Sequence, residues 1–397
     1  MSRPFEGVRV LDFTQVFAGP FGTYQLAVLG ADVIKVERPG GEEMRNGPLS
    51  KEWSDRGMAP GWISINANKR NIALDMKDPK AVEIVKRLVK TADVVTENFR
   101  PGVMHRLGVG YEALSAINPG LIYCAVSGFG QNGPERNTPS YDGRIQAVSG
   151  IMSITGHEGT GPTRAGFAVC DAIGGMTSAF AIASALFQRS QTGKGQCIDV
   201  AMLDSTLAFL SPLVSEHTTT GHVHGQYGNQ AISRRPTANL FKVGEDNLLL
   251  AVNTEKQFQA LMHAIGQPEL LDDPRFADWH GRTEHEPALR QIIEDAFASD
   301  EIATWEARLA EAGAPASQVR NIAEAVSHPQ LQHRDVMQSV ESPFGTLNLV
   351  ANGFRLAHGG ASIDRAPVAP GADAEEILAE AGYDSGEIEA FRAAGVI

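Results

Sequence analysis

Asp171 is the residue whose type and setting most directly suggest chemistry. It is the one charged residue between Arg164 and Arg189, and it follows the apolar run GFAVC. Burying a lone carboxylate is costly unless it is hydrogen-bonded, neutralised or used. Two compatible interpretations follow: Asp171 caps a helix that begins with AIGGM, or it is a nucleophile that a helix N-terminus keeps ionised. We expect Gly174 and Gly175 to leave open space beside it.

Other motifs for catalysis receive less support. A GxGxxG pattern spans residues 128–133, but Pro134 and turn-forming residues follow instead of the helix that dinucleotide binding requires. We interpret it as a glycine-rich loop at the carboxyl edge of a sheet. The GxSxG and P-loop motifs are absent from the sequence. The two histidines of GHVHG allow a zinc site, but a solvated linker is the favoured interpretation, and we predict no metal.

Charge and composition narrow the partners. The net charge is −13 and no basic run offsets it, which argues against nucleic acid. An anionic ligand would need a local basic pocket. Three cysteines without metal-ligand spacing, and a start without the apolar core of a signal peptide, predict a cytoplasmic location. The stretch around Asp171 is long enough to cross a membrane, but its charge and glycines favour a buried strand-turn-helix, so we predict no membrane.

An α/β fold must position these residues. A helix is predicted over residues 78–91, capped by Asp78 with Pro79 in its first turn. Alternation of strands and helices predicts a parallel sheet with helices on both faces. The predicted strands of this first half are residues 8–14, 31–37, 92–99, 121–129 and 195–203.

The pattern changes near Gly221, where a segment rich in His, Gly and Gln begins. A strand at 247–253 and helices at 255–266 and 286–298 indicate a smaller α+β domain. The length of 397 residues independently predicts two domains. The tail adds a strand-like segment at 344–354 and a helix at 373–382.

The whole chain resembles the class III CoA-transferases, a family that includes formyl-CoA transferase, carnitine CoA-transferase and, by relation, α-methylacyl-CoA racemase. The matches run nearly end to end and in order, which makes them more specific than any single motif. The segments that carry the resemblance are GVRVLDFTQVFAGP, LGADVIKVERPGG, NKRNIALDMK, ADVVTENFRPGVMHRLG, SGFGQNGP, YDGRIQAVSG, TGKGQCIDVAMLD and GYDSGEIEAFRAAGVI.

The resemblance implies that Asp171, at the end of GFAVCD, is the catalytic nucleophile. Its carboxylate attacks the donor thioester and forms a mixed anhydride, and the released CoA thiolate then yields an aspartyl-CoA thioester. The incoming acid repeats these steps in reverse. The implied reaction uses acyl-CoA and a short carboxylic acid, with no cofactor beyond CoA.

Family position also implies a CoA site and a substrate site. The CoA contacts would supply the local positive charge, since Arg suits phosphate; they are Arg38, Leu74, Lys77, Asn98, Phe99 and Arg106. The substrate contacts implied are Gln15, Phe17, Tyr141, Arg234 and Arg235. Several relatives have a lysine just before the position of Tyr141, where this chain has TPSY.

Two departures from the formyl-CoA transferases suggest a dicarboxylic acid other than oxalate. Phe17 replaces a glutamine, and NQAISRRP replaces a glycine-rich loop. Arg234 and Arg235 offer a cationic fork for a second carboxylate, of the succinate, mesaconate or malate type; ordinary linker charge is the alternative. The two acids, and whether transfer is intermolecular or intramolecular, are left open.

Two other functions were weighed. The racemase branch has a histidine in a GHD pattern where this chain has Tyr141 and Asp142, and tyrosine is a poor proton shuttle near neutral pH. A non-catalytic CoA-binding protein is disfavoured by the intact Asp171. We therefore expect a transferase.

The family fold implies an interlocked-ring homodimer with a Rossmann-like large domain and a smaller α+β domain. The expected boundaries are 1–220 for the CoA-binding part of the large domain that carries Asp171, 221–330 for the linker and small domain, and 331–397 for a segment that returns to the large domain.

Overall fold

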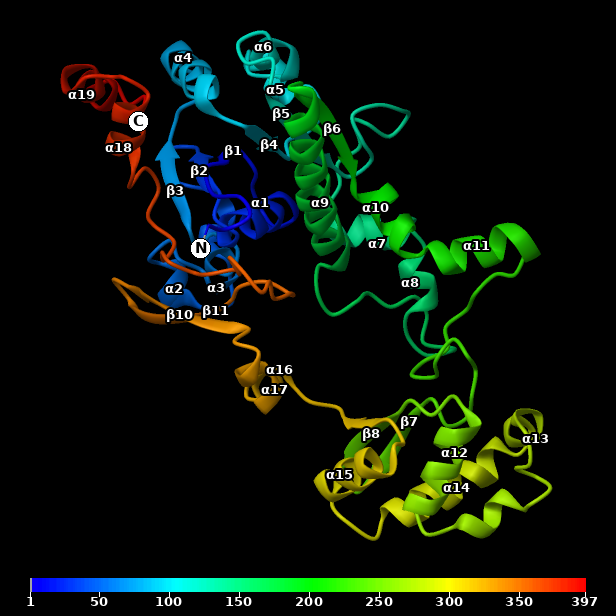
Figure 1. Cartoon of the computed structure of the whole chain (residues 1–397). Coiled ribbons are helices and arrows are strands. Elements are labelled where there is room, and N and C mark those ends of the chain that lie inside the picture. Colours follow the sequence, from blue (N-terminus) through cyan, green and yellow to red (C-terminus); the bar gives the residue numbers. More distant parts are fainter. Residues whose placement is uncertain (1) are drawn as a thin grey trace. The chain divides into compact units, whose positions relative to one another are not determined.

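The computed structural model describes residues 2–397 and forms two compact units (Figure 1). The large unit comprises Met1–Ile151, Ala165–His222 and Gln330–Ile397, and the small unit comprises Met152–Arg164 and Val223–Pro329. The segment 152–164 belongs to the small unit because it is hydrogen-bonded to the chain after Val223. The Gln226 amide donates to the carbonyls of Thr155 (2.6 Å) and Gly161 (2.7 Å).

The large unit is built on a six-stranded sheet in the order β3-β2-β1-β4-β5-β6. Each neighbouring pair is parallel, as the alternation of strands and helices predicts. Leu11 lies at the centre of the register, opposite Ile34 on one side and Val95 on the other. The strands are β1 (Arg9–Asp12), β2 (Asp32–Glu37), β3 (Lys69–Ala73), β4 (Val94–Glu97), β5 (Ile122–Ser127) and β6 (Gln196–Ala201).

All five strands predicted for the first half are confirmed, and β3 was missed. Its sequence, KRNIA, lacks the apolar run of a buried strand. Lys69 and Asn71 are nevertheless buried, because they hydrogen-bond to the carboxylates of Asp12 on β1 and Glu37 on the neighbouring strand β2.

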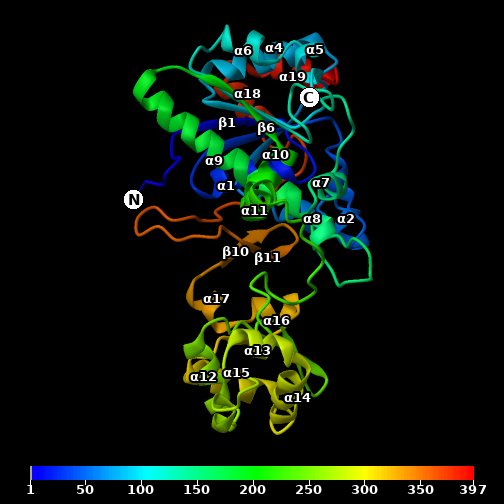
Figure 2. The same ribbon diagram turned by 90° about the vertical axis from the view of Figure 1, so that its right-hand side faces the viewer.

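Helices cover both faces of the sheet (Figures 1 and 2). On one face α4, α18 and α19 bury apolar residues with Leu11, Ile34 and Val95. On the other face α1 and α9 bury residues with Val10 and Val33. The predicted cap of α4 is confirmed, since the Asp78 carboxylate accepts from the Lys80 N–H.

The helices of the large unit connect or flank these strands. They are α1 (Ala18–Val28), α2 (Lys51–Ser54), α3 (Pro60–Ile63), α4 (Pro79–Leu88), α5 (Val103–Arg106), α6 (Tyr111–Ser115), α7 (Asp142–Val148), α9 (Val169–Thr192), α10 (Met202–Phe209), α11 (Ser211–Thr220), α18 (Ala374–Glu380) and α19 (Ser385–Ala393). Short 3₁₀ turns are formed by Glu43–Asn46 and Val89–Thr91. The boundary segments contain α8 (Ile151–Ile154) and α17 (Pro329–His333).

Helices α1 and α9 meet at their backbones. A Cβ at Gly22 would lie 2.2 Å from the Ser178 Oγ and 2.8 Å from the Gly175 carbonyl oxygen. A Cβ at Gly175 would lie 2.5 Å from the Ala18 carbonyl oxygen. Only glycine permits this approach, so α1 and α9 pack closely at Gly22 and Gly175.

The apolar stretch around Asp171 differs from its prediction. Residues 165–168 form no strand, and one helix, α9, runs from Val169 to Thr192. This helix is long and apolar enough to cross a membrane by length and composition, a test that core helices also pass. One side of the helix packs on α1 and on the sheet in the large unit.

The C-terminal residues of the large unit add a hairpin, β10 (Met337–Ser342) and β11 (Gly345–Val350), before α18 and α19. They are tied to β3, because the Asp373 carboxylate accepts from the Asn71 N–H (2.8 Å). The predicted strand at 344–354 and helix at 373–382 correspond to β11 and α18.

The small unit is a three-stranded antiparallel sheet, β7-β8-β9, packed with helices. Its strands are β7 (Leu240–Val243), β8 (Asp246–Leu250) and β9 (Ala316–Gln318), and Pro268–Leu271 is a 3₁₀ turn. Its helices are α12 (Glu255–Ala264), α13 (Trp279–Glu284), α14 (Glu286–Phe297), α15 (Ile302–Ala312) and α16 (Ile322–Val326). The predicted strand at 247–253 and the two predicted helices are confirmed.

Candidate active site

The strand order creates a crevice between β1 and β4. The chain leads from β1 outward through β2 to β3, and then returns to β4 on the other side of β1. In open α/β sheets ligands bind at such a switch point, beyond the carboxyl ends of the strands. Here the two ends are joined by a reciprocal pair: the Gln15 N–H donates to the Asn98 Oδ1 (2.8 Å), and the Asn98 amide donates to the Gln15 carbonyl (2.7 Å).

A cavity of about 280 Å³ opens at this switch point. The segments after β1, β4 and β5 and the first turn of α9 supply its walls. Six of the predicted site residues line it: Gln15, Phe17, Asn98, Phe99, Tyr141 and Asp171. Its other lining residues include Val16, Ala18, Arg100, Ser127, Gly128, Ser140 and Met202.

One of the two sequence interpretations, that Asp171 caps a helix, is wrong. The N-cap of α9 is Ala168, and Asp171 is the third residue of the helix. Asp142 takes over the capping from a distance, because its Oδ1 accepts from the N–H groups of Cys170 (2.8 Å) and Asp171 (3.4 Å). The amide of Gln146 donates to the other Asp142 oxygen (2.6 Å) and holds this carboxylate in place.

This arrangement changes the expected charge state of Asp171. Burial and the nearby Asp142 carboxylate raise the pKa of Asp171 to about 7. No cation among residues 2–397 lowers the pKa of Asp171. This raised pKa opposes the expectation that the helix N-terminus keeps the carboxylate ionised.

A second buried carboxylate lies behind the glycine-rich loop. Glu97, at the end of β4, is 5% exposed and accepts from the Phe99 N–H (2.8 Å). Burial and the charge of Asp199 raise its pKa to about 8. Asp199 itself accepts from the Gln131 N–H (2.9 Å) in the loop. No helix begins in this loop, as predicted.

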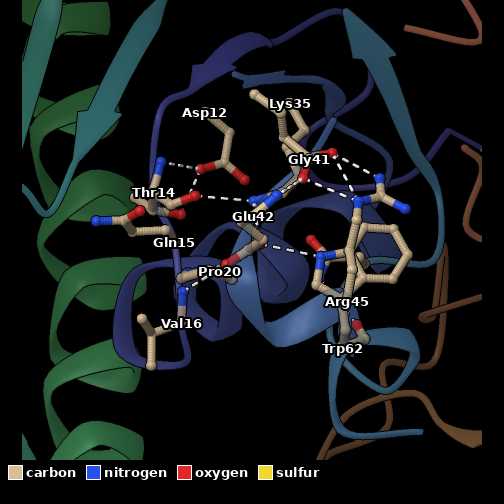
Figure 3. A network of polar contacts seen from close by, with 12 residues as sticks. Asp12, Thr14, Gln15, Val16, Pro20, Lys35, Gly41, Glu42, Arg45 and Trp62 are labelled. Carbon is tan, nitrogen blue, oxygen red and sulfur yellow. Dashed lines mark hydrogen bonds and ion pairs between the residues drawn. The ribbon is translucent and has the colours of Figure 1, made fainter. Parts of the chain in front are cut away.

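A buried network of charges supports the loop after β1 (Figure 3). The Lys69 ammonium donates to the Asp12 Oδ2 (3.0 Å), and the Asp12 Oδ1 accepts from the Thr14 N–H (3.0 Å). Burial would raise the pKa of Asp12, but the charges of Lys69 and Lys35 outweigh it and hold the pKa below its usual value. The carboxylate therefore stays ionised in the core.

The network continues through Glu42 (Figure 3) and through Glu37. Lys35 lies 3.0 Å from the Glu42 Oε1. Arg45 donates from Nε to the Glu37 Oε1 (2.9 Å), and its guanidinium carbon lies 3.6 Å from the centre of the Trp62 ring. Burial opposes ionisation of Glu37, but the hydrogen bond from Arg45 and the charge of Lys35 lower its pKa.

The predicted CoA contacts divide into two groups. Asn98 and Phe99 line the cavity, whereas the other four residues do not. Arg38 and Lys77 are exposed and follow β2 and β3, so they lie at the same carboxyl edge of the sheet. Arg106 is exposed at the end of α5. Leu74 has 0% exposed surface and packs in the core, so a contact with CoA would require the structure above it to open.

Arg234 and Arg235 belong to the small unit and point at different partners. The guanidinium of Arg234 lies 4.4 Å from the Tyr227 ring centre, and that of Arg235 lies 4.4 Å from the Trp279 ring centre. Arg234 also has a positive φ of 56°. The two side chains therefore do not form a fork in this conformation.

Three residues of the site were missed as functional by sequence reasoning. Asp142 entered the sequence analysis only as the neighbour of Tyr141 in the racemase pattern, and Glu97 only as part of a strand. Ser140 was read as part of a turn, yet its Oγ is buried in the cavity wall without a hydrogen-bond partner among the described residues. A lone acidic residue at a strand end or before a helix was the available signal for the first two.

Comparisons with known proteins show the family. The model of CoA-transferase family III matches residues 5–374, so the chain belongs to CoA-transferase family III. It is 41% identical over 337 residues to an acetyl-CoA:oxalate CoA-transferase of Acetobacter aceti, covering 84% of this chain and 85% of the relative. It is 35% identical over 399 residues to a succinyl-CoA:glutarate CoA-transferase of Mus musculus, covering 100% and 90%.

The fold also has a solved counterpart. A CaiB/BaiF family protein from Brucella suis superposes with a TM-score of 0.86 at 32% identity, covering 96% of this chain and 100% of that chain. Both comparisons agree with the resemblance drawn from the sequence motifs. The protein is a class III CoA-transferase.

Proposed function

We propose that this enzyme transfers CoA between an acyl-CoA and a short dicarboxylic acid, with Asp171 as the nucleophile. The observation that carries the proposal is the Asp171 carboxyl in a cavity at the switch point, with a pKa raised to about 7. A carboxylate with a raised pKa remains available at neutral pH and is a better nucleophile than an ordinary one.

The chemistry follows from this one group. The Asp171 carboxylate attacks the thioester carbonyl carbon. The C–S bond then breaks, CoA leaves as a thiolate, and the acyl group stays on Asp171 as a mixed anhydride. The thiolate attacks the aspartyl carbonyl, releases the donor acid as a carboxylate, and leaves an aspartyl-CoA thioester. The acceptor carboxylate then reverses both steps and regenerates Asp171. The uncapped N-terminus of α1, with Ala18 at the cavity, favours the negative charge that develops on oxygen.

The dicarboxylate is supported by the names of the relatives. Relatives at 34–38% identity are named for glutarate, D-citramalate and mesaconate as partners of succinyl-CoA or succinate. The relative at 41% identity is named for oxalate, which weighs against the argument from Phe17 and NQAISRRP that oxalate is not a substrate. We keep a dicarboxylate as the proposal and include oxalate in its test.

The test is a screen of CoA exchange from succinyl-CoA to glutarate, mesaconate, malate, oxalate and monocarboxylates of matched length, followed by mass spectrometry. We expect at least one dicarboxylate to exceed its matched monocarboxylate tenfold in kcat/KM. Isotope-labelled substrate separates transfer between molecules from transfer within one molecule. Preference for the monocarboxylates would contradict the proposal.

The second carboxylate requires a cation, since burying it without a partner is costly. We propose Arg234 and Arg235 for this contact, after their side chains leave the rings of Tyr227 and Trp279. Arg234→Gln and Arg235→Gln should each lower kcat/KM for the best dicarboxylate about tenfold or more, and much less for a monocarboxylate. Lys256→Gln, an exposed change in the same unit, is the control. Equal losses for both acids would assign the arginines to structure.

The exposed basic residues at the sheet edge are proposed to bind CoA phosphates. Arg38→Ala and Arg106→Ala should raise the KM for acyl-CoA several-fold more than they lower kcat, because phosphate contacts bind substrate and transition state alike. Steady-state kinetics with varied acyl-CoA measure this. Unchanged KM values would place the phosphates elsewhere.

We also propose a homodimer in the cytoplasm. Large aromatic side chains on α9 and α10 are exposed in the single chain: Phe180 is 75%, Phe187 68% and Phe209 63% exposed. A soluble monomer rarely exposes such an apolar surface. The interlocked-ring arrangement comes from the family resemblance, and the three free cysteines support a reducing compartment.

A further inference from the structure

Val16 has a backbone conformation that its side chain disfavours. Its φ is 67°, in the left-handed region, and it is the β-branched member of the four such non-glycine residues among residues 2–397. A β-branched residue in this region is an outlier that persists only where the surroundings impose it. Val16 lines the cavity that contains Asp171, so the strain lies in the wall of the candidate active site.

Glu42 holds this conformation. Its Oε2 accepts from the Val16 N–H at 2.7 Å, while its Oε1 accepts from the Trp62 Nε1 at 2.9 Å and lies 3.0 Å from the Lys35 ammonium (Figure 3). Glu42 is 5% exposed and does not line the cavity. The carboxylate is therefore fixed by two donors on one oxygen and uses the other on Val16.

The neighbouring residues are held in the same way. The Lys35 ammonium also donates to the Thr14 carbonyl (2.8 Å), and Gln15 is joined to Asn98 by the reciprocal pair. Each residue of the segment 14–16 thus hydrogen-bonds to a side chain from another part of the chain, and Figure 3 shows the partners of Thr14 and Val16. The next residues, Phe17 and Ala18, begin α1 and face the cavity.

We propose that Glu42 is a positioning residue for CoA transfer. It acts through Val16: the hydrogen bond keeps Val16 left-handed, and this conformation aims Phe17 and the N-terminus of α1 at the space beside Asp171. Without the bond, Val16 relaxes to a negative φ and the wall of the cavity shifts. The inference rests on the proposed function, because it assumes that the transfer takes place at Asp171.

Glycine at position 16 separates positioning from a merely structural role. Glycine adopts a positive φ without steric cost, so it needs the Glu42 hydrogen bond much less than valine does. A variant of Glu42 that fails because Val16 relaxes should be rescued by Val16→Gly. A variant that fails because a buried charge pair is broken should not be rescued.

The experiment compares Glu42→Gln, Glu42→Asp, Val16→Gly and both double variants. Glu42→Asp keeps the charge beside Lys35 but withdraws the carboxylate by one methylene, so it serves if Glu42→Gln does not fold. We expect either Glu42 variant to lower kcat about 100-fold with KM for acyl-CoA changed less than threefold. We expect the added Val16→Gly change to raise the kcat of each Glu42 variant at least tenfold. Glu52→Gln, an exposed carboxylate in the same segment, should stay within twofold of the wild type.

Amide hydrogen exchange of the peptide containing residues 14–17 provides a readout independent of activity. We expect faster exchange in the Glu42 variants than in Glu52→Gln. A kcat within twofold of the wild type, or a loss that Val16→Gly does not restore, would overturn the proposal. A wild type that transfers no CoA to any acid would instead overturn the proposed function. The amide hydrogen exchange result for residues 14–17 would still stand.

Discussion

The two sides of the cavity treat buried carboxylates in opposite ways. Behind the loop after β1, Asp12, Glu37 and Glu42 each face a lysine or arginine, and the pKa values of Asp12 and Glu37 are lowered. Asp171, which is half-buried in the cavity wall, and the buried Glu97 have no such partner among the causes of their pKa shifts, and their pKa values rise to about 7 and 8. The paired carboxylates belong to the buried network, whereas the raised pKa of the unpaired Asp171 fits the role of nucleophile that we propose for it.

The largest effect should come from neutralising the unpaired side. Asp171→Asn keeps the shape but removes the charge, so CoA transfer should fall at least 1000-fold. Incubation of the wild type with acyl-CoA and then hydroxylamine should modify Asp171, as peptide mass spectrometry would detect. A variant with substantial transfer would show that another group carries the acyl exchange.

The same substitution should raise stability, because it removes an unpaired buried charge. A carboxyl whose pKa is higher in the folded state binds a proton between about pH 4 and 7 when the unfolded chain does not, so stability falls as pH rises through this window. Asp171→Asn should therefore be more stable at pH 8 by about 1–3 kcal/mol, and the gain should vanish near pH 4. Urea unfolding at both pH values measures it.

Breaking the paired side should have the reverse outcome. Arg45→Met leaves Glu37 buried without its main partner and should cost about 3–5 kcal/mol in the free energy of unfolding. The matched control is Arg56→Met, since Arg56 also lies over a tryptophan but pairs with exposed Glu52; it should cost less than about 1 kcal/mol. Similar losses for both would remove the distinction between buried and exposed pairs.

The smallest effect should be on pH dependence. The wild-type kcat/KM should fall below about pH 7 as Asp171 becomes protonated. Asp142→Asn keeps a capping side chain for α9 but removes the negative charge that helps to raise the pKa of Asp171. The acidic limb of the rate profile should therefore move to lower pH by a fraction of a unit. Rate profiles from pH 5 to 9 measure it. An unmoved limb would leave burial as the only cause.

Local patterns were sufficient for much of the large unit. Strands β1, β2, β4, β5 and β6 and the Asp78 cap follow from apolar runs and a helix start signal, and family position brought six residues to the cavity. Pairings across distant parts of the chain escaped this reasoning. Asp142 caps α9 from 28 residues away and Glu42 reaches Val16 from 26.

The charge state of Asp171 and the strand β3 could not be predicted from the sequence for the same reason. A helix N-terminus predicts an ionised carboxylate, but the pKa depends on burial and on Asp142, which the order of residues does not reveal. Lys69 and Asn71 disguise β3, since polar residues count against a buried strand until their partners Asp12 and Glu37 are known.

The glycine contact between α1 and α9 has a consequence for how this site can change. Phe17 and Ala18 at the start of α1 and Asp171 at the start of α9 face the same cavity, and the two helices touch through Gly22 and Gly175. Neither glycine position has room for a side chain, so any larger residue at Gly22 or Gly175 forces the helices apart. If the transfer takes place at Asp171 as proposed, we expect acids of different size to be accommodated by the other walls, at Tyr141 and the glycine-rich loop, while the gap between Asp171 and α1 keeps one width.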